Sequence, residues 1–316
     1  MQEVTMEPNQ QPLLEVSDLS VSFQMYRRGL TRQRLQVISS LSLSVYPGEI
    51  LAVAGSSGSG KSLLASAILG ILPGNARVEG RLSFDGRPLT PDRQAELRGG
   101  EIALVPQSVA FLDPLMKVGP QADGHRKPRP TEKRRSLFRR FGLPEQTERL
   151  YPFQLSGGMA RRVLVSTALL AGARLIIADE PTPGMSLDQA REALQMFRDL
   201  ADAGKAVVLI THDIDLAFHF AHRIAVFYAG TTVETAPAED FRRGPEALRH
   251  PYSRALWRAL PQHDFAPIAG FQPYAGDLPR GCLFAPRCPH RTAQCESAVP
   301  PVRRVRDGEV RCFHAT

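Results

Sequence analysis

The chain has 316 residues, of which 43% are hydrophobic and 22% are charged, and its formal net charge is +7. This composition excludes a wholly disordered chain, and the length indicates about two domains or one large domain with an appendage. No run approaches the roughly 18 consecutive apolar residues of a membrane-spanning helix, and the N-terminus lacks the basic and apolar regions of a signal peptide, so we expect a cytoplasmic protein. The positive charge suits nucleic acid, an anionic membrane surface or phosphorylated ligands.

The first block of the chain has the pattern of half-buried strands. Leu13–Phe23 and Leu41–Val45 alternate apolar and polar residues and are rich in β-branched side chains. We expect the polar residues between them, Met25–Gln36, to form a loop. Ile50–Ala54 is a short continuous apolar run, followed by a Gly/Ser turn and by residues that are apolar at helical spacing. This succession of strand, tight loop and helix opens a parallel α/β unit.

The Gly/Ser turn has the complete pattern of a phosphate-binding loop. The motif G-x-x-x-x-G-K-[ST] is matched at every position by Gly55, Ser56, Ser57, Gly58, Ser59, Gly60, Lys61 and Ser62. Glycines let successive backbone N–H groups converge on a phosphate, and the N-terminus of the following helix adds its positive dipole end. Lys61 is placed to reach the β- and γ-phosphate oxygens, and Ser62 to hold Mg²⁺. A turn that merely caps a helix does not need the Lys-Ser pair.

Further elements follow along the chain. Short apolar runs predict buried strands at Ile102–Val105, Leu175–Ala178 and Val207–Ile210. Helical periodicity falls at Met159–Leu170, Leu187–Leu200 and Ile214–His222. Residues of about 113–172 have little strand character, so we expect a helical insertion in the α/β body.

Two acidic residues end one of these strands. Asp179 and Glu180 follow Leu175–Ala178, and carboxylates at the C-terminal edge of a parallel sheet lie where ligands bind in open α/β folds. Asp179 suits outer coordination of Mg²⁺, and Glu180 suits a general base or a residue that orients water for attack on the γ-phosphate. Such a pair is weak evidence alone. Together with the phosphate loop it predicts nucleotide hydrolysis.

A basic segment lies within the predicted helical insertion. Eight Lys or Arg residues and a single acid, Glu132, lie between Arg126 and Arg140, which gives this segment the net charge of the whole chain. A solvated helix face is the first interpretation, and a docking surface for an acidic partner or lipid headgroups is the second. Nucleic acid is a weaker third, because no aromatic residues are interleaved with the cations.

All four cysteines lie in the last 35 residues, at Cys282, Cys288, Cys295 and Cys312. Disulfides are disfavoured in a cytoplasmic protein, so ligation of a metal or a cluster is the leading interpretation. The spacings contain no C-x2-C pair, which argues against the common zinc ribbons, whereas four thiolates are what a [4Fe–4S] cluster needs. Zinc and free thiols remain alternatives. The composition shifts to Pro, Arg and Gly after about residue 235, where we expect a C-terminal appendage to begin.

A further motif distinguishes one subclass of phosphate-loop nucleotide hydrolases from the others. It is Leu155-Ser156-Gly157-Gly158-Met159, which precedes a predicted helix. Here the sequence resembles the ATP-binding cassette (ABC) ATPases, whose LSGGQ signature has this place, over residues of about 13–260. The resemblance implies a P-loop NTPase cassette of the α/β class, with a RecA-like core, an antiparallel β subdomain and a helical subdomain at about 113–172. In that family the signature, here Ser156, Gly157 and Gly158, faces the γ-phosphate bound to the opposite subunit.

Other positions match the family's functional residues. Gln107 resembles the glutamine that contacts Mg²⁺ and the attacking water, and His212 resembles the histidine that hydrogen-bonds the γ-phosphate. Phe23 or, alternatively, Tyr26 resembles the aromatic residue that stacks on adenine. The resemblance thus implies that Glu180, His212 and Gln107 are catalytic and that Ser62, Gln107 and Asp179 hold Mg²⁺.

The sequence departs from the family pattern at two of these motifs. Met159 replaces the signature's Gln, a variant that the peptide-importer branch also shows. Ser186 stands where the family usually has the Asp of the loop after the catalytic glutamate, and Asp188 lies two residues later. If Ser186 weakens one composite ATP site, this subunit would be the asymmetric half of a heterodimer.

The C-terminal residues indicate which branch of the ABC ATPases the sequence resembles. His250–Leu256 and Gly281–Pro289 look like the C-terminal extension of the dipeptide, oligopeptide and nickel importer ATPases, in some of which the cysteines ligate a [4Fe–4S] cluster. We therefore expect residues 1–235 to form the ABC nucleotide-binding domain and residues 236–316 to form a small extension that carries the four cysteines.

The implied function is that of an ATP-binding and ATP-hydrolysing subunit of an importer for peptides or for nickel or metal-chelate complexes. The implied cofactors are ATP, Mg²⁺ and a [4Fe–4S] cluster. The implied partners are a second ATPase subunit, two transmembrane permeases and an extracytoplasmic substrate-binding protein, with the chain bound at the cytoplasmic face of the membrane and to no nucleic acid. Exporter ATPases and nucleic-acid or translation ATPases are the alternatives. The importer-type tail argues against the first, and the lack of a second cassette or a long coiled-coil insertion argues against the second.

Overall fold

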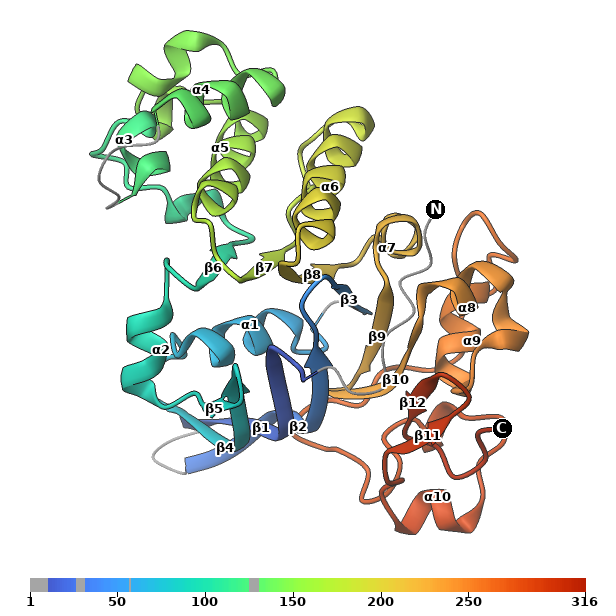
Figure 1. Cartoon of the computed structure of the whole chain (residues 1–316). Coiled ribbons are helices and arrows are strands. Elements are labelled where there is room, and N and C mark those ends of the chain that lie inside the picture. Colours follow the sequence, from blue (N-terminus) through green and yellow to red (C-terminus); the bar gives the residue numbers. More distant parts are fainter. Residues whose placement is uncertain (1–10, 27–31, 57, 125–130) are drawn as a thin grey trace.

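A computed structural model of the chain describes residues 11–26, 32–56, 58–124 and 131–316 (Figure 1). Its centre is a sheet with the strand order β11-β12-β10-β9-β3-β8-β7-β6. Five adjacent strands run parallel: β9 (Arg223–Tyr228), β3 (Ile50–Gly55), β8 (Ala206–Thr211), β7 (Leu175–Asp179) and β6 (Ile102–Val105). Nearly all their residues are buried, as continuous apolar runs predict for a sheet that is covered on both faces. The predicted strands are confirmed, and β9 is additional to them.

A second, antiparallel sheet has the order β2-β1-β4-β5. Its strands are β1 (Leu14–Tyr26), β2 (Arg32–Val45), β4 (Ala76–Phe84) and β5 (Arg87–Pro88). The prediction of a loop over Met25–Gln36 is wrong for most of that range, because the ladder of β1 and β2 continues as far as the pair Tyr26 and Arg32. An exposed hairpin end can carry polar side chains on its strands, since the backbone hydrogen bonds of the ladder do not depend on them.

Helices cover the central sheet on two sides. α1 (Lys61–Leu69) and the antiparallel sheet share one core, whereas α5 (Gly157–Leu170), α6 (Leu187–Asp202) and α7 (Ile214–Phe220) share another. The strand β8 shows the division, because Val208 and Ile210 belong to the first core and Val207 and Leu209 to the second. This alternation is the two-residue period of a strand buried on both faces.

The predicted helical insertion is confirmed as a block of helices beyond the β6 edge of the sheet (Figure 1). It contains α3 (Val118–Asp123), α4 (Thr131–Arg140) and α5, and α2 (Pro91–Leu97) precedes it beside the antiparallel sheet. The basic segment is not wholly a solvated face. Arg134 of α4 is buried and forms ion pairs with Asp123 and Glu148. Arg126, Lys127 and Arg129 lie outside the described residues.

The C-terminal part is built from short elements. They are α8 (Ala238–Arg243), α9 (Pro251–Arg258), α10 (Ala293–Ser297), β11 (Arg303–Val305) and β12 (Gly308–Val310). β12 pairs with β10 (Thr231–Pro237), so the end of the chain extends the central sheet. The predicted domain boundary at residue 235 falls within β10. No helix in the described ranges has the length and apolar character needed to cross a membrane.

Candidate active site

The phosphate loop joins the end of β3 to the start of α1. Gly58 and Gly60 have φ angles of 76° and 96°, a left-handed conformation that glycine adopts without strain. Gly60 is also the N-cap of α1, so the loop ends at a helix N-terminus, which favours anions. The turn therefore has the backbone of an anion-binding loop. Ser57 lies outside the described residues.

Lys61 is folded back onto this loop. Its Nζ donates hydrogen bonds of 2.9 Å to the carbonyl oxygens of Gly55 and Ser56. Burial lowers the pKa of Lys61, and the carboxylates of Glu180 and Asp179 raise it in part. A buried cation beside two carboxylates is stabilised by them and is available to an incoming polyphosphate.

Asp179, the last residue of β7, has the surroundings of a cation ligand. Burial raises its pKa, whereas a hydrogen bond with Ser62 lowers it. Its Oδ1 is buried and has no hydrogen-bond partner among the described residues. A carboxylate oxygen and a hydroxyl oxygen are ligands that Mg²⁺ prefers, and a buried acceptor without a partner is costly unless something binds it. The pair of Asp179 and Ser62 therefore fits a magnesium ion.

Glu180 meets two residues from neighbouring strands. Gln107, which follows β6, donates from Nε2 to Glu180 Oε2 at 3.0 Å, and Nδ1 of His212, which follows β8, lies 3.2 Å from Glu180 Oε1. Glu180 has a φ angle of 47°, uncommon for a residue with a side chain, and its N–H donates to the carbonyl of Ile210 at 2.9 Å. The ends of three adjacent parallel strands thus bring together the three residues predicted to be catalytic. A carboxylate held in this way can orient a water molecule and accept its proton.

Arg161 of α5 is a further residue of this site, and no sequence motif marks it. Its Nη1 donates to the carbonyl of Pro106 at 2.8 Å, next to Gln107. Burial lowers the pKa of Arg161, and the charges of Glu180 and Asp179 raise it. The helix that begins at the signature is therefore linked to the glutamine of the catalytic group. Sequence pattern does not reveal such a contact, because an Arg on an amphipathic helix is usually exposed.

The signature residues lie apart from this group. Ser156 is the N-cap of α5, and its Oγ accepts a hydrogen bond from the N–H of Met159 at 3.3 Å. Gly158 approaches the loop after β7 so closely that a Cβ atom on it would lie 2.8 Å from the carbonyl oxygen of Gly184. In Figure 1, α5 belongs to the helical block and α1 lies on the other side of the strands β6 and β7. Among the described residues, no hydrogen bond or ion pair joins these signature residues to Glu180, Gln107 or His212.

Ser186 has a structural role that the sequence comparison with the family pattern does not show. It is the N-cap of α6, where its Oγ accepts from the N–H of Gln189 and the Gln189 side chain accepts from the N–H of Ser186, both at 3.3 Å. This reciprocal pair is a capping box. Serine and aspartate are both favoured N-caps, so Ser186 can replace aspartate in this role.

The two candidates for the adenine contact differ in exposure. Phe23 is half-buried and packs against the core under the antiparallel sheet. Tyr26, at the end of β1, is 65% exposed. Both lie on the strand β1, and the structure leaves either ring as the candidate.

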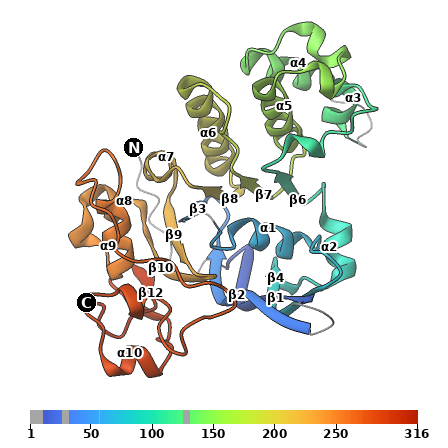
Figure 2. The same ribbon diagram turned by 180° about the vertical axis from the view of Figure 1, so that it is seen from behind.

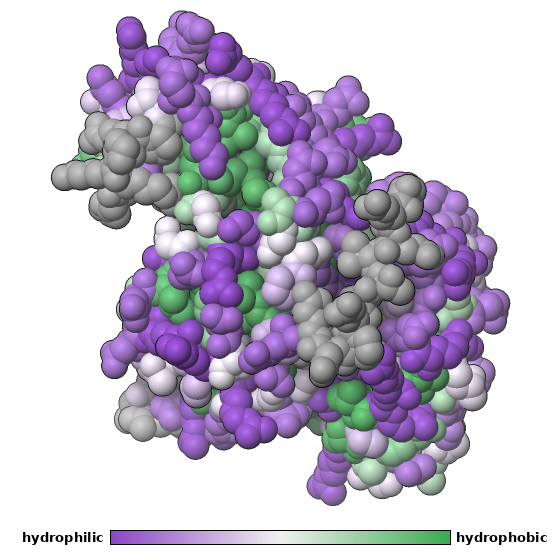
Figure 3. Space-filling view, viewed as in Figure 1, coloured by the Kyte–Doolittle hydropathy of each residue, from purple (hydrophilic) through white to green (hydrophobic). Residues whose placement is uncertain are grey.

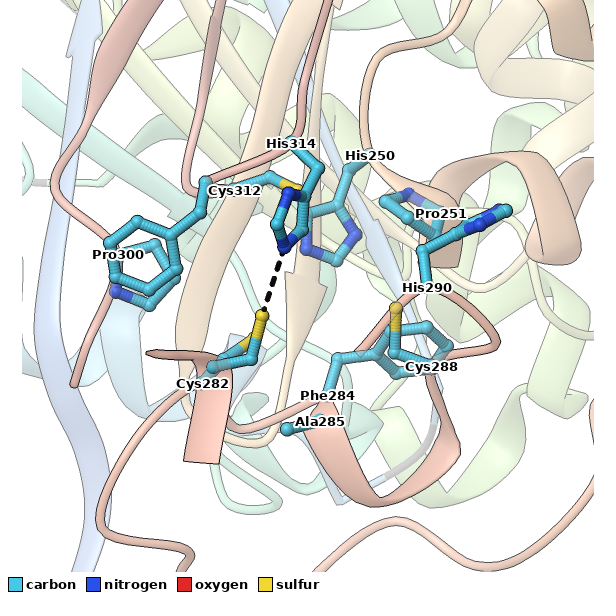
Figure 4. A pocket seen from close by; sticks show the side chains of 12 residues that line it. His250, Pro251, Cys282, Phe284, Ala285, Cys288, His290, Pro300, Cys312 and His314 are labelled. Carbon is cyan, nitrogen blue, oxygen red and sulfur yellow. Dashed lines mark hydrogen bonds between the residues drawn. The ribbon is translucent and has the colours of Figure 1, made fainter. Parts of the chain in front are cut away.

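All four cysteines line one small pocket in the C-terminal part (Figure 4). They are free thiols, and burial, together with the charges of neighbouring cysteines, raises the pKa of Cys282, Cys288 and Cys312. Sγ of Cys295 lies 3.4 Å from Nε2 of His314. No three His, Cys, Asp or Glu side chains in the described ranges are arranged around a single metal ion. The four thiols thus line a shared pocket.

The fold and the group around Glu180 define a P-loop nucleotide hydrolase. Residues 38–183 match the family model of the ABC transporter, and residues 233–295 match that of the oligopeptide/dipeptide transporter C-terminal region. The dipeptide transport ATP-binding protein DppD of Escherichia coli is 36% identical over 94% of both chains. The oligopeptide transport ATP-binding protein OppD of Salmonella typhimurium is 34% identical over 95% of this chain and 93% of its own.

Solved structures agree with these matches. A post-hydrolysis dimer of an ATP-binding cassette with ADP and Pi has 25% sequence identity and a TM-score of 0.63, and the match covers 71% of this chain and 98% of that one. The chain belongs to the ABC transporter ATPases, in the branch that carries the oligopeptide/dipeptide C-terminal region. The predicted resemblance is confirmed, and ATP hydrolysis coupled to transport is the reaction of this family.

Proposed function

We propose that this chain hydrolyses ATP for an importer of di- or oligopeptides. The observation that carries the proposal is the similarity over nearly the whole chain, C-terminal region included, to proteins named for dipeptide and oligopeptide transport. These relatives have peptide names and no nickel name, so peptides are the favoured solute and nickel or metal-chelate complexes are the alternative.

The residues of the site have separate roles in this proposal. Lys61 and the backbone N–H groups of the phosphate loop bind the β- and γ-phosphates of ATP. Ser62 and Asp179 would hold Mg²⁺, which neutralises charge on the phosphates when bound. Glu180 orients the attacking water and accepts its proton, with Gln107 and His212 holding the carboxylate. Phe23 or Tyr26 stacks on the adenine.

A second ATPase subunit completes the site. The helix α5 begins with Gly157 and Gly158, after its N-cap Ser156, and it belongs to the helical block. This position supports the binding of the three residues to the γ-phosphate on a partner cassette. A partner of different sequence is favoured because Ser186 replaces the usual aspartate. The two composite sites would then differ in their loop residues.

Two transmembrane permeases and an extracytoplasmic substrate-binding protein are the further partners. The helical block exposes Phe111, Leu115, Met116 and Phe153, the second to 87% and the last to 74%. Figure 3 shows apolar atoms among polar ones on this block. Exposed apolar side chains in one region mark an interaction surface, here a docking site for a cytoplasmic helix of a permease. Through it the chain would be bound at the cytoplasmic face of the membrane.

The experiment that tests the function is uptake by the assembled transporter. The chain is produced together with candidate permeases, a second ATPase subunit and a substrate-binding protein, and the complex is placed in proteoliposomes with ATP inside. Dipeptides or oligopeptides should accumulate and stimulate ATP hydrolysis. Uptake of nickel without uptake of peptides, or export in place of import, would contradict the proposal.

The four cysteines are proposed to ligate a [4Fe–4S] cluster. The four thiols line one pocket, a [4Fe–4S] cluster takes one thiolate for each iron, and the cysteine spacing lacks the C-x2-C pair of the common zinc ribbons. When bound, the cluster would link the loop at Cys282 and Cys288 to α10 and to the C-terminal end.

Anaerobic purification tests this ligation. The protein should be brown, absorb at about 400 nm and contain iron and sulfide in equal amounts, and Cys312→Ser should lose both. Stoichiometric zinc without iron would reject the cluster.

A further inference from the structure

The C-terminal part of the chain contacts the phosphate loop directly. Ser56 Oγ donates a hydrogen bond of 2.6 Å to Gln272 Oε1, although these residues lie 216 positions apart. Burial raises the pKa of Tyr252 in α9, and hydrogen bonds with Ser56 lower it in part. Ser56 is therefore held by two residues that do not belong to the phosphate-loop motif.

Gln272 belongs to an extended segment, residues 268–277, that we name the strap. At one end of the strap, the carbonyl oxygens of Ile268 and Ala269 accept hydrogen bonds of 3.0 and 2.8 Å from the guanidinium group of Arg287, which precedes Cys288. At the other end, a Cβ atom on Gly276 would lie 3.6 Å from Nε2 of Gln33 in β2. Figure 2 shows the chain passing from the C-terminal part to β2. The strap thus crosses from the cysteine-bearing region to the β1–β2 hairpin by way of the phosphate loop.

Both ends of the expected ATP site lie along this path. In the β1–β2 ladder Gln33 is opposite Met25, the neighbour of Tyr26. The hairpin therefore carries both candidates for the adenine contact, and Ser56 lies at the phosphate end. The strap thus contacts the phosphate loop through Gln272 and approaches the hairpin at Gly276.

Ser56 links Gln272 of the strap to Lys61 of the phosphate loop. The carbonyl oxygen of Ser56 accepts a hydrogen bond from Lys61 Nζ, while the hydroxyl of the same residue is bonded to Gln272. Ser56 is exposed, so without the strap its position would rest on the loop and on the contact with Tyr252. A loop that is already held in its binding conformation loses less entropy when its ligand binds.

We propose that the strap is part of the nucleotide site and that Gln272 is a positioning residue, which orders the phosphate loop for ATP by holding Ser56. Gln272 does not touch the phosphates in this scheme. The proposal rests on the binding of ATP at the phosphate loop, which is also part of the proposed function.

A double-mutant cycle on the full chain tests the proposal. MgATP binding is measured by isothermal titration calorimetry for Gln272→Ala, Ser56→Ala and the double variant. Each single substitution should raise Kd by about fivefold, the factor that corresponds to one hydrogen bond of ordinary net strength. The double variant should be no weaker than the weaker single variant, because both substitutions remove the same contact. In the assembled transporter, Gln272→Ala should raise KM for ATP and leave kcat unchanged.

Two controls separate the possible failures. Gln262→Ala replaces an exposed glutamine in the same connecting region and should leave Kd unchanged. Wild-type affinity in Gln272→Ala, or effects of the two substitutions that simply add, would overturn the proposal. Lys61→Ala should weaken ATP binding whatever the strap does. If it does not, the assignment of the nucleotide site fails, and the proposal for Gln272 fails with it.

Discussion

At the scale of single residues, function depends on side chains that strand ends bring together. Glu180 has hydrogen-bond contacts with Gln107 and His212, and its own backbone conformation is one that few non-glycine residues adopt. Such a conformation persists where the surrounding structure imposes it, which is common at functional sites. The carboxylate of Glu180 is therefore fixed before any nucleotide binds.

The buried lysine gives the first prediction. Lys61→Ala removes the cation that reaches the phosphates, and the loss of its charge-assisted hydrogen bonds should raise Kd for ATP by about 10- to 100-fold. Isothermal titration of the purified chain measures the change. Lys133→Ala, at an exposed position of α4, is the matched control and should bind ATP as the wild type does. Unchanged affinity for ATP in Lys61→Ala would show that the phosphate loop does not bind ATP.

A buried histidine gives the second prediction. Burial first, and then the charge of Arg198, lower the pKa of His222 to about 4, and its Nδ1 accepts the N–H of Ile50 at 2.9 Å. The unfolded chain binds this proton below a pH of about 6.5 and the folded chain does not, so stability falls as pH drops from 6.5 towards 4.

His222→Asn should reduce this loss, because the Asn side chain can accept the same N–H and does not titrate. Between pH 7 and pH 5 the difference should be about 1 kcal/mol in the free energy of unfolding, less than the full linkage value because the ring is only half-buried. Urea unfolding at both pH values measures it. An equal loss of stability in the variant and the wild type would contradict the assignment.

Several of these residues could be predicted from the sequence, and others could not. The phosphate loop and the pair Asp179 and Glu180 are contiguous motifs next to recognisable strands, so their neighbours in space follow from the topology of a parallel sheet. The contacts of Ser56 with Gln272 and of Arg161 with Pro106 join distant parts of the chain through irregular segments. No periodicity marks such contacts.

At the scale of elements, an ion-pair network joins the C-terminal helices to the central sheet. The side chain of Arg249 is 1% exposed and meets Glu234 of β10 at 3.4 Å and Asp240 of α8 at 2.7 Å, and it donates to the carbonyl of Val305 in β11 at 2.7 Å. Glu234 also accepts the N–H groups of Arg249 and His250. Three elements thus share one buried cation.

Arg249→Met should destabilise the protein by about 3–5 kcal/mol, because it leaves buried carboxylates without their cation. The free energy of unfolding in urea measures the loss. Arg304→Met, at an exposed position of β11, is the control and should stay within about 0.5 kcal/mol of the wild type. A change of less than 1 kcal/mol in Arg249→Met would show that the network is not needed to hold the C-terminal elements.

The elements also show why some segments differ from their predictions. Polar composition predicts a loop over Met25–Gln36, but the hairpin continues through much of it. Alternation of side chains signals a strand only where one face is buried, and the outer part of this hairpin is largely exposed. The helix α7 ends at Phe220, two residues before the predicted position, and His222 beyond it accepts a hydrogen bond from the N–H of Ile50.

At the scale of the whole molecule, the chain is a cassette whose C-terminal part reaches back to the phosphate loop. The helical block carries the signature and the exposed apolar side chains, whereas the group around Glu180 lies at the ends of the central strands. A composite site between two cassettes would join the signature of one subunit to the phosphate loop of the other. The net charge of +7 suits phosphorylated ligands, and part of the basic segment is paired within the helical block.

In the proposed function, this chain hydrolyses ATP through Glu180 in an assembled transporter. The most direct test is the rate of ATP hydrolysis by the reconstituted complex, with the catalytic glutamate of the partner ATPase subunit already replaced, so that only this chain's glutamate can act. Glu180→Gln should lower kcat by at least about 100-fold and leave ATP binding intact, because it removes the base and keeps the phosphate loop. Glu96→Gln, at an exposed position of α2, should leave the rate unchanged. Undiminished hydrolysis in Glu180→Gln would contradict the account.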